Sequence, residues 1–278
     1  MTKHTQRLKR LKIGRNRGNN LIKIFMRYFR ELSDKKIMDV GCGHGSLTLD
    51  FARHFKKVHS IESGDAQRNV AIQRVKNSNL NNITVKKDNA INIQSTKEKF
   101  NVIHLSGVFE WLKYGDLSRS AEYCQDKFLK NIKKNMSADS VLYSGTENKL
   151  FPYFWISDPH YRNMPLTAIL PEKISDMLFR IIKGKRYVPK INSYWKLKKM
   201  FEKHFSKAEF YIPIPHYQYV YEFASINNRK EIIKKCKKVL KEHKLDTKQK
   251  FSVLWIKLFA KVGLIKVLTP GFITVARK

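Results

Sequence analysis

The sequence predicts an α/β protein with a doubly wound, mostly parallel sheet. Apolar stretches of strand length alternate with amphipathic stretches of helix length through about the first half of the chain. Strands and helices that alternate in this way build parallel sheets, because each helix returns the chain to the same edge. The 278 residues, 42% of them hydrophobic, are enough for one large domain with a substantial core.

The spacing of apolar residues places the elements in chain order. A helix is expected from Asn19, capped by Asn19 or Asn20, because Leu21, Phe25 and their neighbours share one face. The expected strands are Lys36–Val40, Val58–Glu62, Ile83–Lys87, Asn101–Ser106 and Ser140–Gly145. The helices between them are expected to end near Phe55 and to cover Asp65–Asn77 and Leu117–Lys134.

The alternation stops after the fifth strand. Residues 146–190 are rich in aromatic residues and proline, with one short helix near Glu172–Ile182. The alternation resumes with a helix over Ser193–His204 and an extended run over Ala208–Pro213. Helical residues 227–266 and a last strand over Gly271–Ala276 follow. We therefore expect a basic arm (1–18), a ligand-binding core (19–147), a cap over the strand ends (148–192) and a C-terminal part (193–278). The last part completes the sheet and carries a basic helical segment.

A glycine-rich turn follows the first strand, in the order Asp39-Val40-Gly41-Cys42-Gly43-His44-Gly45-Ser46. Glycines at every second position let a ligand approach the main chain, and the next helix offers free N–H groups. The dinucleotide fingerprint requires glycine or alanine where Ser46 stands, and no Gly-Lys-Ser/Thr triplet of a phosphate-binding loop follows. The turn therefore predicts a different small ligand.

Two acidic residues stand where a nucleoside would need them. Glu62 ends the second strand, 21 residues after Gly41, at the position that binds ribose hydroxyls in related folds. Asp88 follows the third strand and could face an adenine amino group. The alternative for Glu62 is an exposed carboxylate at a strand end.

Residues 37–147 resemble the core of a class I S-adenosylmethionine (SAM)-dependent methyltransferase, which implies a seven-stranded Rossmann-like sheet and methyl transfer from SAM. The resemblance places Gly41, Gly43 and Gly45 at the amino acid moiety of the cofactor and lets Asp39 orient the turn. It implies Glu62 at the ribose. The remaining cofactor contacts that it implies are Cys42, Ser63, Asp88, Asn89, Ala90, Ser106 and Gly107.

The resemblance extends into the predicted cap. Glu147-Asn148-Lys149, Asp158-Pro159-His160 and Leu170-Pro171 look like the insert of a bacterial and archaeal subgroup. The ending Pro270–Lys278 looks like the last strand of that subgroup. Members often carry Glu-His after the fourth strand, where this chain has Glu110-Trp111, so no catalytic histidine can be placed at position 111.

Methyl transfer needs a base only if the acceptor must lose a proton. The candidates are His160, Glu110 and Asp158, with Asp158 available to orient His160. The alternatives are a structural histidine and a Glu110 that caps the following segment. Five cap aromatics could wall the acceptor pocket or simply pack on the sheet: Phe151, Tyr153, Phe154, Trp155 and Tyr161.

The formal charge of +33 is concentrated at the two ends of the chain. Residues 1–37 carry 12 Lys and Arg against 2 Asp and Glu, and residues 225–278 carry 15 against 3. Such ends could contact nucleic acid or an anionic membrane, or they could reflect a lysine-rich composition. The apolar, lysine-spaced segment 251–266 could lie in a membrane interface, but packing on the domain is the commoner outcome.

The remaining composition favours a cytoplasmic protein. The three cysteines are scattered without metal-ligand or redox spacing, no metal is expected, and no uncharged apolar run could span a bilayer. The predicted function is SAM-dependent methylation of a small-molecule, glycan or lipid-linked acceptor. An RNA methyltransferase is the first alternative, although neither an Asn/Asp-Pro-Pro-Tyr/Phe motif nor a Pro-Cys nucleophile is present. The second is a non-catalytic SAM-binding or membrane-associated scaffold.

Overall fold

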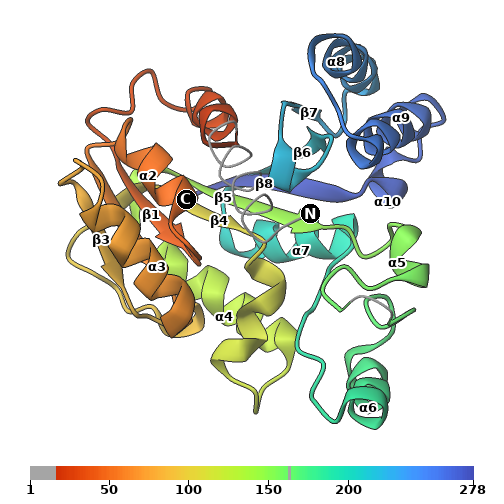
Figure 1. Ribbon diagram of the computed structural model, residues 1–278, viewed down its shortest axis with the longest axis horizontal. Helices are drawn as coiled ribbons and strands as arrows, with labels where there is room; N and C mark the ends of the chain where they lie inside the picture. Colours follow the sequence, from red (N-terminus) through yellow and green to blue (C-terminus); the bar gives the residue numbers. More distant parts are fainter. Residues whose placement is uncertain (1–16, 162–163) are drawn as a thin grey trace.

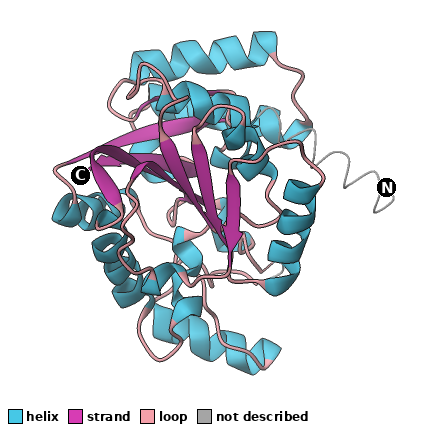
Figure 2. Ribbon diagram, turned by 90° about the vertical axis from the view of Figure 1, so that its left-hand side faces the viewer, coloured by secondary structure: helices cyan, strands magenta, loops and turns pink. Residues whose placement is uncertain are grey.

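The structure is a computed structural model that describes residues 17–161 and 164–278. One eight-stranded sheet crosses it in the order β3-β2-β1-β4-β5-β8-β6-β7, with helices on both faces (Figures 1 and 2). Five strands are parallel neighbours: β1 (Lys36–Val40), β2 (Lys57–Ile61), β3 (Ile83–Lys86), β4 (Phe100–Ser106) and β5 (Met136–Glu147). Their carboxyl ends therefore meet at one edge, where open α/β sheets bind ligands.

The other side of the sheet is antiparallel. There β8 (Gly271–Arg277) pairs with β5 and β6 (Lys207–Ile214), and β7 (Glu222–Ser225) forms the edge. The α/β class with a doubly wound, mostly parallel sheet is confirmed, whereas the seven-strand count is wrong by one strand. β7 escaped the sequence analysis because its four residues contain only two adjacent apolar side chains, Phe223 and Ala224.

The two faces of the sheet follow the alternation of side chains along β1. Ile37 faces a core with Leu21 and Phe25 of the N-terminal helical residues 17–25, while Met38 faces a core with Phe128 of α4 (Ala121–Lys133). Helices α2 (Ser46–Ala52) and α3 (Asp65–Lys76) link the first strands. The short 3₁₀ helices are η1 (Ala90–Asn92), η2 (Phe109–Gly115) and η3 (Tyr217–Tyr219).

The expected cap on the first helix is wrong. Arg17 and Gly18 are already helical. The side-chain amide of Asn20 donates a hydrogen bond to the Val220 carbonyl and does not cap the helix. The predicted basic arm, residues 1–18, lies outside the described residues except for these two.

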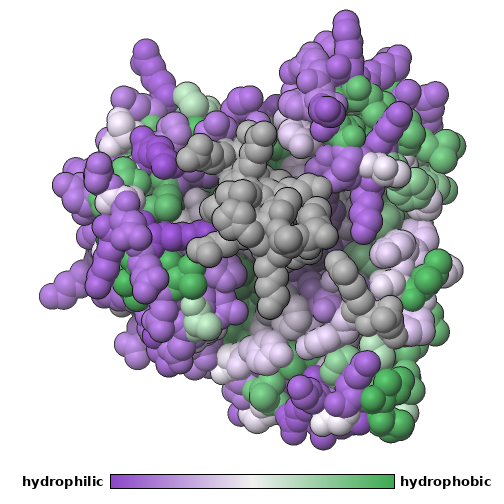
Figure 3. Space-filling model, in the orientation of Figure 1, coloured by the Kyte–Doolittle hydropathy of each residue, from purple (hydrophilic) through white to green (hydrophobic). Residues whose placement is uncertain are grey.

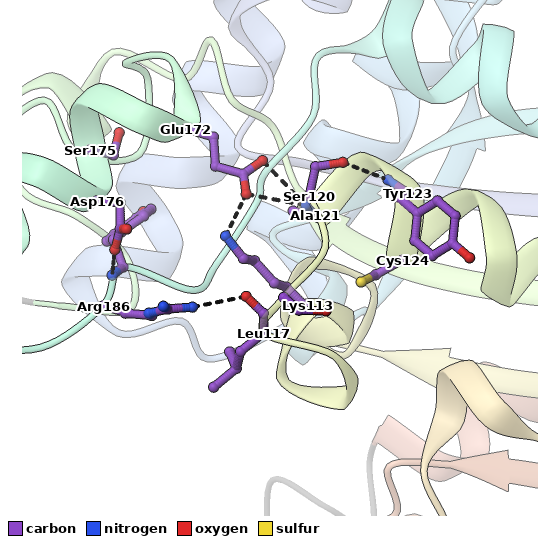
Figure 4. Close-up of polar contacts among 12 residues, drawn as sticks. Lys113, Leu117, Ser120, Ala121, Tyr123, Cys124, Glu172, Ser175, Asp176 and Arg186 are labelled. Carbon is purple, nitrogen blue, oxygen red and sulfur yellow. Dashed lines mark hydrogen bonds and ion pairs between the residues drawn. The ribbon is translucent and has the colours of Figure 1, made fainter.

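The segment after β5 contains α5 (Tyr153–Ile156) and α6 (Glu172–Lys183), followed by α7 (Tyr194–His204). Figure 4 shows how α6 is held to the core: Glu172 Oε1 accepts a hydrogen bond from Lys113 Nζ at 2.6 Å and from the Ala121 amide at 3.2 Å. Arg186 also donates to the Leu117 carbonyl at 2.9 Å. The cap is therefore fastened to η2 and to the start of α4.

The C-terminal part contains α8 (Arg229–Glu242), α9 (Thr247–Lys261) and α10 (Ile265–Leu268). Val253, Ile256 and Ala260 of α9 are buried in the core, while Leu254 and Leu258 are exposed. Segment 251–266 thus packs on the domain through one face and leaves an apolar face outside. None of the helices among residues 17–161 and 164–278 is both long and apolar enough to cross a membrane.

Candidate active site

A cavity of about 710 Å³ opens at the carboxyl ends of the parallel strands. Seven of the predicted cofactor contacts line it: Gly41, Glu62, Ser63, Asp88, Asn89, Ala90 and Gly107. The other five, Asp39, Cys42, Gly43, Gly45 and Ser106, are not among its lining residues. Sequence reasoning missed the remaining lining residues, which are Ile61, Gly64, Gln67, Val108, Trp111, Leu112, Tyr114 and Gly115.

The glycine turn adopts a backbone that other residues rarely can. Gly41, Gly43 and Gly45 have φ values of +68°, +54° and +74°. A Cβ on Gly41 would lie 2.5 Å from Val108 Cγ2, and one on Gly45 would lie 3.0 Å from Ala71 Cβ. A Cβ on Gly43 would meet nothing within 4 Å. The open space over Gly43 is where a ligand can approach the main chain.

Glu62 joins this turn to the cavity wall. Its carboxylate accepts hydrogen bonds from the Gly43 amide at 2.8 Å and from the Gly64 amide at 2.9 Å. Each carboxylate oxygen can accept a further bond, so Glu62 can hold the turn and still receive ribose hydroxyls. Asp88 is an exposed lining residue, and its Oδ1 accepts from the Asn89 amide at 2.7 Å.

Asp39 stabilises the elements on either side of the glycine turn. Its buried carboxylate accepts hydrogen bonds from the Thr48 hydroxyl at 2.7 Å and from His104 Nδ1 at 2.8 Å. Burial lowers the pKa of His104, so the neutral ring donates its Nδ1–H to Asp39. Through Thr48 and His104, Asp39 connects α2 to β4.

A second group of polar side chains lies between η2, the end of β5 and the cap. Glu110 and Glu147 are almost fully buried, 1% and 5% exposed. The Thr146 hydroxyl donates to Glu110 Oε2 at 3.2 Å, and the Tyr217 hydroxyl donates to Glu147 Oε1 at 2.6 Å. His160 packs edge-on against Trp111, with 4.6 Å between ring centroids. The structure therefore brings two of the three predicted catalytic residues together.

The electrostatics of this group separate the two carboxyls. Burial, reinforced by the Glu147 carboxylate, raises the pKa of Glu110 well above its ordinary value. Burial also disfavours the charge on Glu147, but His160, Glu110, His216 and Tyr217 together lower its pKa. Burial lowers the pKa of His160. Of the two carboxyls, Glu110 therefore keeps its proton to higher pH and Glu147 ionises first, while burial favours the neutral imidazole of His160.

Glu147 was not among the predicted catalytic residues. It belongs to the Glu-Asn-Lys motif, and its position at the end of β5 is the signal that could have identified it, because ligands bind at strand ends. The sequence predicted that the loop containing Trp111, after the fourth strand, would lie beside the methionine part of the cofactor, and it marked Trp111 as a departure from a family pattern. In the structure Trp111 stacks on Tyr114 at 5.7 Å, and both rings line the cavity.

Asp158 is 1% exposed, and its carboxylate accepts hydrogen bonds from other residues of the cap. Oδ1 accepts from the His160 and Tyr161 amides, both at 2.8 Å, and Oδ2 accepts from the Thr167 hydroxyl at 2.8 Å and the Tyr187 hydroxyl at 2.6 Å. Asp158 therefore holds the main chain at His160 and makes no hydrogen bond to its ring. The predicted orientation of the imidazole by Asp158 is not what the structure shows.

The cap aromatics mostly pack or face solvent. Phe154 is buried, Tyr153 and Trp155 are exposed, and Phe151 packs against Trp255 of α9 with ring centroids 5.7 Å apart. Tyr161 packs on Phe179, and its ring centroid lies 6.1 Å from that of the cavity-lining Trp111.

Comparison with known proteins decides the family. Residues 31–202, more than half of the chain, match the family described as a methyltransferase domain. This chain belongs to that methyltransferase family. The fold prediction and the class I, SAM-dependent assignment are thereby confirmed.

The curated relatives of this methyltransferase match over part of their length. A probable cobalt-precorrin-6B C(15)-methyltransferase (decarboxylating) of Methanococcus maripaludis is 29% identical over 89 residues, 30% of this chain and 49% of that protein. A malonyl-[acyl-carrier protein] O-methyltransferase of Bacillus cereus is 22% identical over 134 residues, 48% of this chain and 45% of that protein. This methyltransferase thus spans about half the length of the curated relatives that it matches.

Solved structures support the fold over nearly the whole methyltransferase. Phosphoethanolamine N-methyltransferase 2 of Haemonchus contortus, in complex with S-adenosyl-L-methionine, aligns with a TM-score of 0.54 at 13% identity. The alignment covers 94% of this chain and 52% of that one. At this identity the likeness concerns the fold.

The cavity of this methyltransferase fits SAM. Its volume lies within the range of about 300–1,000 Å³ that small-molecule and cofactor sites occupy. The Glu62 carboxylate and the aromatic rings of Trp111 and Tyr114 line this one space.

Proposed function

We propose that this methyltransferase transfers a methyl group from SAM to a small-molecule, glycan or lipid-linked acceptor. One observation carries the proposal: the cavity lined by Gly41 and Glu62 adjoins the buried group of Glu110, Glu147 and His160. The segment Gly107–Trp111 belongs to both places, since Gly107 and Trp111 line the cavity and Glu110 stands between them.

Each side of the cavity has its own task in this proposal. SAM supplies a methyl group that is activated by the positive charge on sulfur. Glu62 receives the ribose hydroxyls, Asp88 with the Asn89–Ala90 segment receives the adenine, and Ser106 and Gly107 lie by the methionine part. Holding the acceptor in line with the methyl group can supply about 7–11 kcal/mol of the acceleration.

The buried group serves the acceptor side of the proposed reaction. Neutral His160 and ionised Glu147 are in the protonation states of bases, so either can take a proton from a hydroxyl or ammonium acceptor. Protonated Glu110 can donate a hydrogen bond. Asp158 is a positioning residue in this proposal, because it holds the main chain that carries His160.

Calorimetric titration with SAM and with S-adenosylhomocysteine tests the cofactor half of the proposal. Both ligands are expected to bind. The Glu62→Gln variant should bind them at least about tenfold more weakly, because an amide nitrogen cannot accept the Gly43 or Gly64 hydrogen bond. Glu98→Gln is the matched control: Glu98 pairs with Lys36 and Lys57 on the surface, and its loss should leave binding unchanged.

The transfer itself is tested by incubating the protein with methyl-labelled SAM and cell extract and identifying the labelled product. A protein that binds neither SAM nor its demethylated product would contradict the cofactor half. Labelled RNA, with RNA binding that falls steeply with salt, would favour the nucleic-acid alternative.

A second observation concerns where the acceptor is met. Helices α5, α6 and α9 lie along one side of the molecule in Figure 1, and hydrophobic surface covers parts of the same side in Figure 3. The exposed apolar side chains of these helices include Trp155, Ile156, Met177, Ile181, Ile182, Phe251, Leu254 and Leu258. Exposed basic residues lie among them, including Lys173, Lys183, Lys185, Lys248, Lys250 and Lys261.

Apolar helix faces bordered by lysine are the pattern of proteins that rest on an anionic membrane. We infer peripheral contact through this side, which would give a lipid-linked acceptor direct access to the cap. The double variant Ile181→Glu/Ile182→Glu should bind vesicles of phosphatidylglycerol and phosphatidylcholine about tenfold or more weakly, because two apolar contacts are lost. Co-sedimentation measures this.

The control for vesicle binding is Met26→Glu, which places one such carboxylate at an exposed methionine outside these helices. Equal binding by all three proteins would contradict the membrane contact. Vesicles of phosphatidylcholine alone should bind more weakly, because the basic residues then have no anionic partner.

A further inference from the structure

Three ionisable side chains meet in the interior from three parts of the chain. Glu110 comes from η2, Glu147 from the last position of β5 and His160 from the cap. One oxygen or nitrogen atom of each lies within 4.8 Å of those of the other two. The two carboxyls are 1% and 5% exposed, so water offers them little solvation.

Most polar atoms of this group already have partners. Glu110 Oε2 and Glu147 Oε1 are fixed by Thr146 and Tyr217, and the two carboxyls hydrogen-bond each other, which requires a proton between them. His160 Nε2 is buried without any hydrogen bond from the described residues, and leaving a buried polar atom unpaired costs about 1–3 kcal/mol. A cation in place of the shared proton would meet both carboxylates and this unpaired nitrogen.

The donor set and its size indicate what that occupant is. Two ligand atoms that each lie about 2.1 Å from a common ion can be no more than about 4.2 Å apart. Three ligand atoms arranged tetrahedrally around such an ion are closer still, about 3.4 Å apart, so the group, whose atoms lie within 4.8 Å of one another, would contract by up to about 1.4 Å on binding. Two carboxylate oxygens and one imidazole nitrogen suit Zn²⁺, Mn²⁺ or Fe²⁺ better than the all-oxygen shells of Mg²⁺ and Ca²⁺.

We propose that Glu110, Glu147 and His160 bind a divalent transition-metal ion through Glu110 Oε1, Glu147 Oε2 and His160 Nε2. Thr146 and Tyr217 are positioning residues, since each fixes the second oxygen of a ligating carboxylate. Asp158 positions the third ligand by holding the His160 amide. Three protein ligands leave coordination positions open, as catalytic metal sites do.

The ion would face the cavity. A Cβ placed on the cavity-lining Gly107 would lie 3.8 Å from Glu110 Oε1, and the cavity-lining Trp111 ring packs against His160. With an ion bound, His160 and Glu147 would be ligands and no longer bases, and an acceptor hydroxyl on the open side of the ion would lose its proton to water more readily, because coordination lowers its pKa. The freed oxygen pair then forms the oxygen–methyl bond while the sulfur–methyl bond of SAM breaks. This activation of a hydroxyl acceptor rests on the proposed function.

The test measures metal binding directly, on untagged full-length protein stripped with a chelator and titrated with Zn²⁺ or Mn²⁺ in the calorimeter. One ion per chain is expected, and Mg²⁺ and Ca²⁺ should bind more weakly. Glu147→Gln and His160→Ala should each weaken binding about tenfold to a hundredfold, as the loss of a ligand requires. Glu147→Gln keeps an oxygen for Tyr217, so the variant is expected to stay folded.

The matched control is His204→Ala. His204 Nε2 lies 2.8 Å from the Asp126 carboxylate on the surface, so this variant removes an ordinary histidine–carboxylate pair. Zinc or manganese binding that persists in Glu147→Gln and His160→Ala, or that is lost in His204→Ala, would overturn the proposal, as would no binding at all. The X-ray absorption spectrum of the zinc-loaded protein should show only nitrogen and oxygen neighbours, with the outer-shell scattering of one imidazole.

Titration of the same stripped protein with S-adenosylhomocysteine separates this proposal from the preceding one. If S-adenosylhomocysteine binds and no metal does, the metal site alone is refuted. If metal binds and S-adenosylhomocysteine does not, the methyltransferase proposal is refuted and the metal site stands.

Discussion

Replacing Gly43 by asparagine is expected to weaken SAM binding about a hundredfold while the protein stays folded. Gly43 has φ +54°, and a Cβ there would meet nothing within 4 Å, so the new side chain would occupy only the space proposed for the ligand. Asparagine tolerates the left-handed backbone better than other side chains, which limits the strain. Forcing extra atoms into a filled site costs about 1–3 kcal/mol.

Gly184→Asn is the matched control for this change. Gly184 ends α6 with φ +64°, and a Cβ there also meets nothing within 4 Å. The two variants should therefore lose similar free energy of unfolding in urea, but only Gly43→Asn should lose affinity in the SAM titration. Equal SAM affinity in both variants would show that the ligand does not pass over Gly43.

Replacing Asp158 by alanine is expected to remove about 3–5 kcal/mol from the free energy of unfolding. The change leaves the Thr167 and Tyr187 hydroxyls and the His160 and Tyr161 amides without their buried acceptor. Asp158→Asn should cost less, because one oxygen still accepts hydrogen bonds. Urea unfolding measures both, with Asp139→Ala at an exposed strand position as the control.

The same variants separate a positioning role of Asp158 from a catalytic one. A positioning role predicts that Asp158→Asn recovers much of the stability and turnover, and that both variants still bind SAM at low temperature. A purely catalytic role predicts normal unfolding with lost turnover. Normal stability in Asp158→Ala would contradict the four hydrogen bonds assigned here.

Periodicity predicted the core of the fold because its elements bury long, regular apolar patterns. Lys36–Val40 matches β1 at both ends, and Ile83–Lys87 misses β3 by one residue. The four-residue β7 is too short to carry such a pattern, although it pairs with β6, the preceding strand along the chain. The capping asparagines failed for a different reason: the Asn20 side chain binds Val220, 200 residues away.

The candidate site could likewise be predicted only in part from the sequence. The glycine turn and Glu62 could be placed because the fold fixes their spacing along the chain. Tyr114 and Gln67 reach the cavity through side-chain directions that no spacing encodes. Asp158 shows the limit most clearly, since its place two residues before His160 suggested contact with the ring. In the structure its Oδ1 binds the main chain and its Oδ2 binds the Thr167 and Tyr187 hydroxyls.

The ion pair between Lys113 and Glu172 has a consequence for how two ligands bind. Lys113 belongs to η2, whose Trp111 and Tyr114 line the cavity, and Glu172 begins α6 of the cap. A ligand that holds η2 in one position would, through this ion pair, also favour the position of α6 that keeps the pair intact. An acceptor that contacts the cap would then change the affinity of the protein for SAM. By thermodynamic reciprocity, SAM would change the affinity of the protein for that acceptor by the same factor.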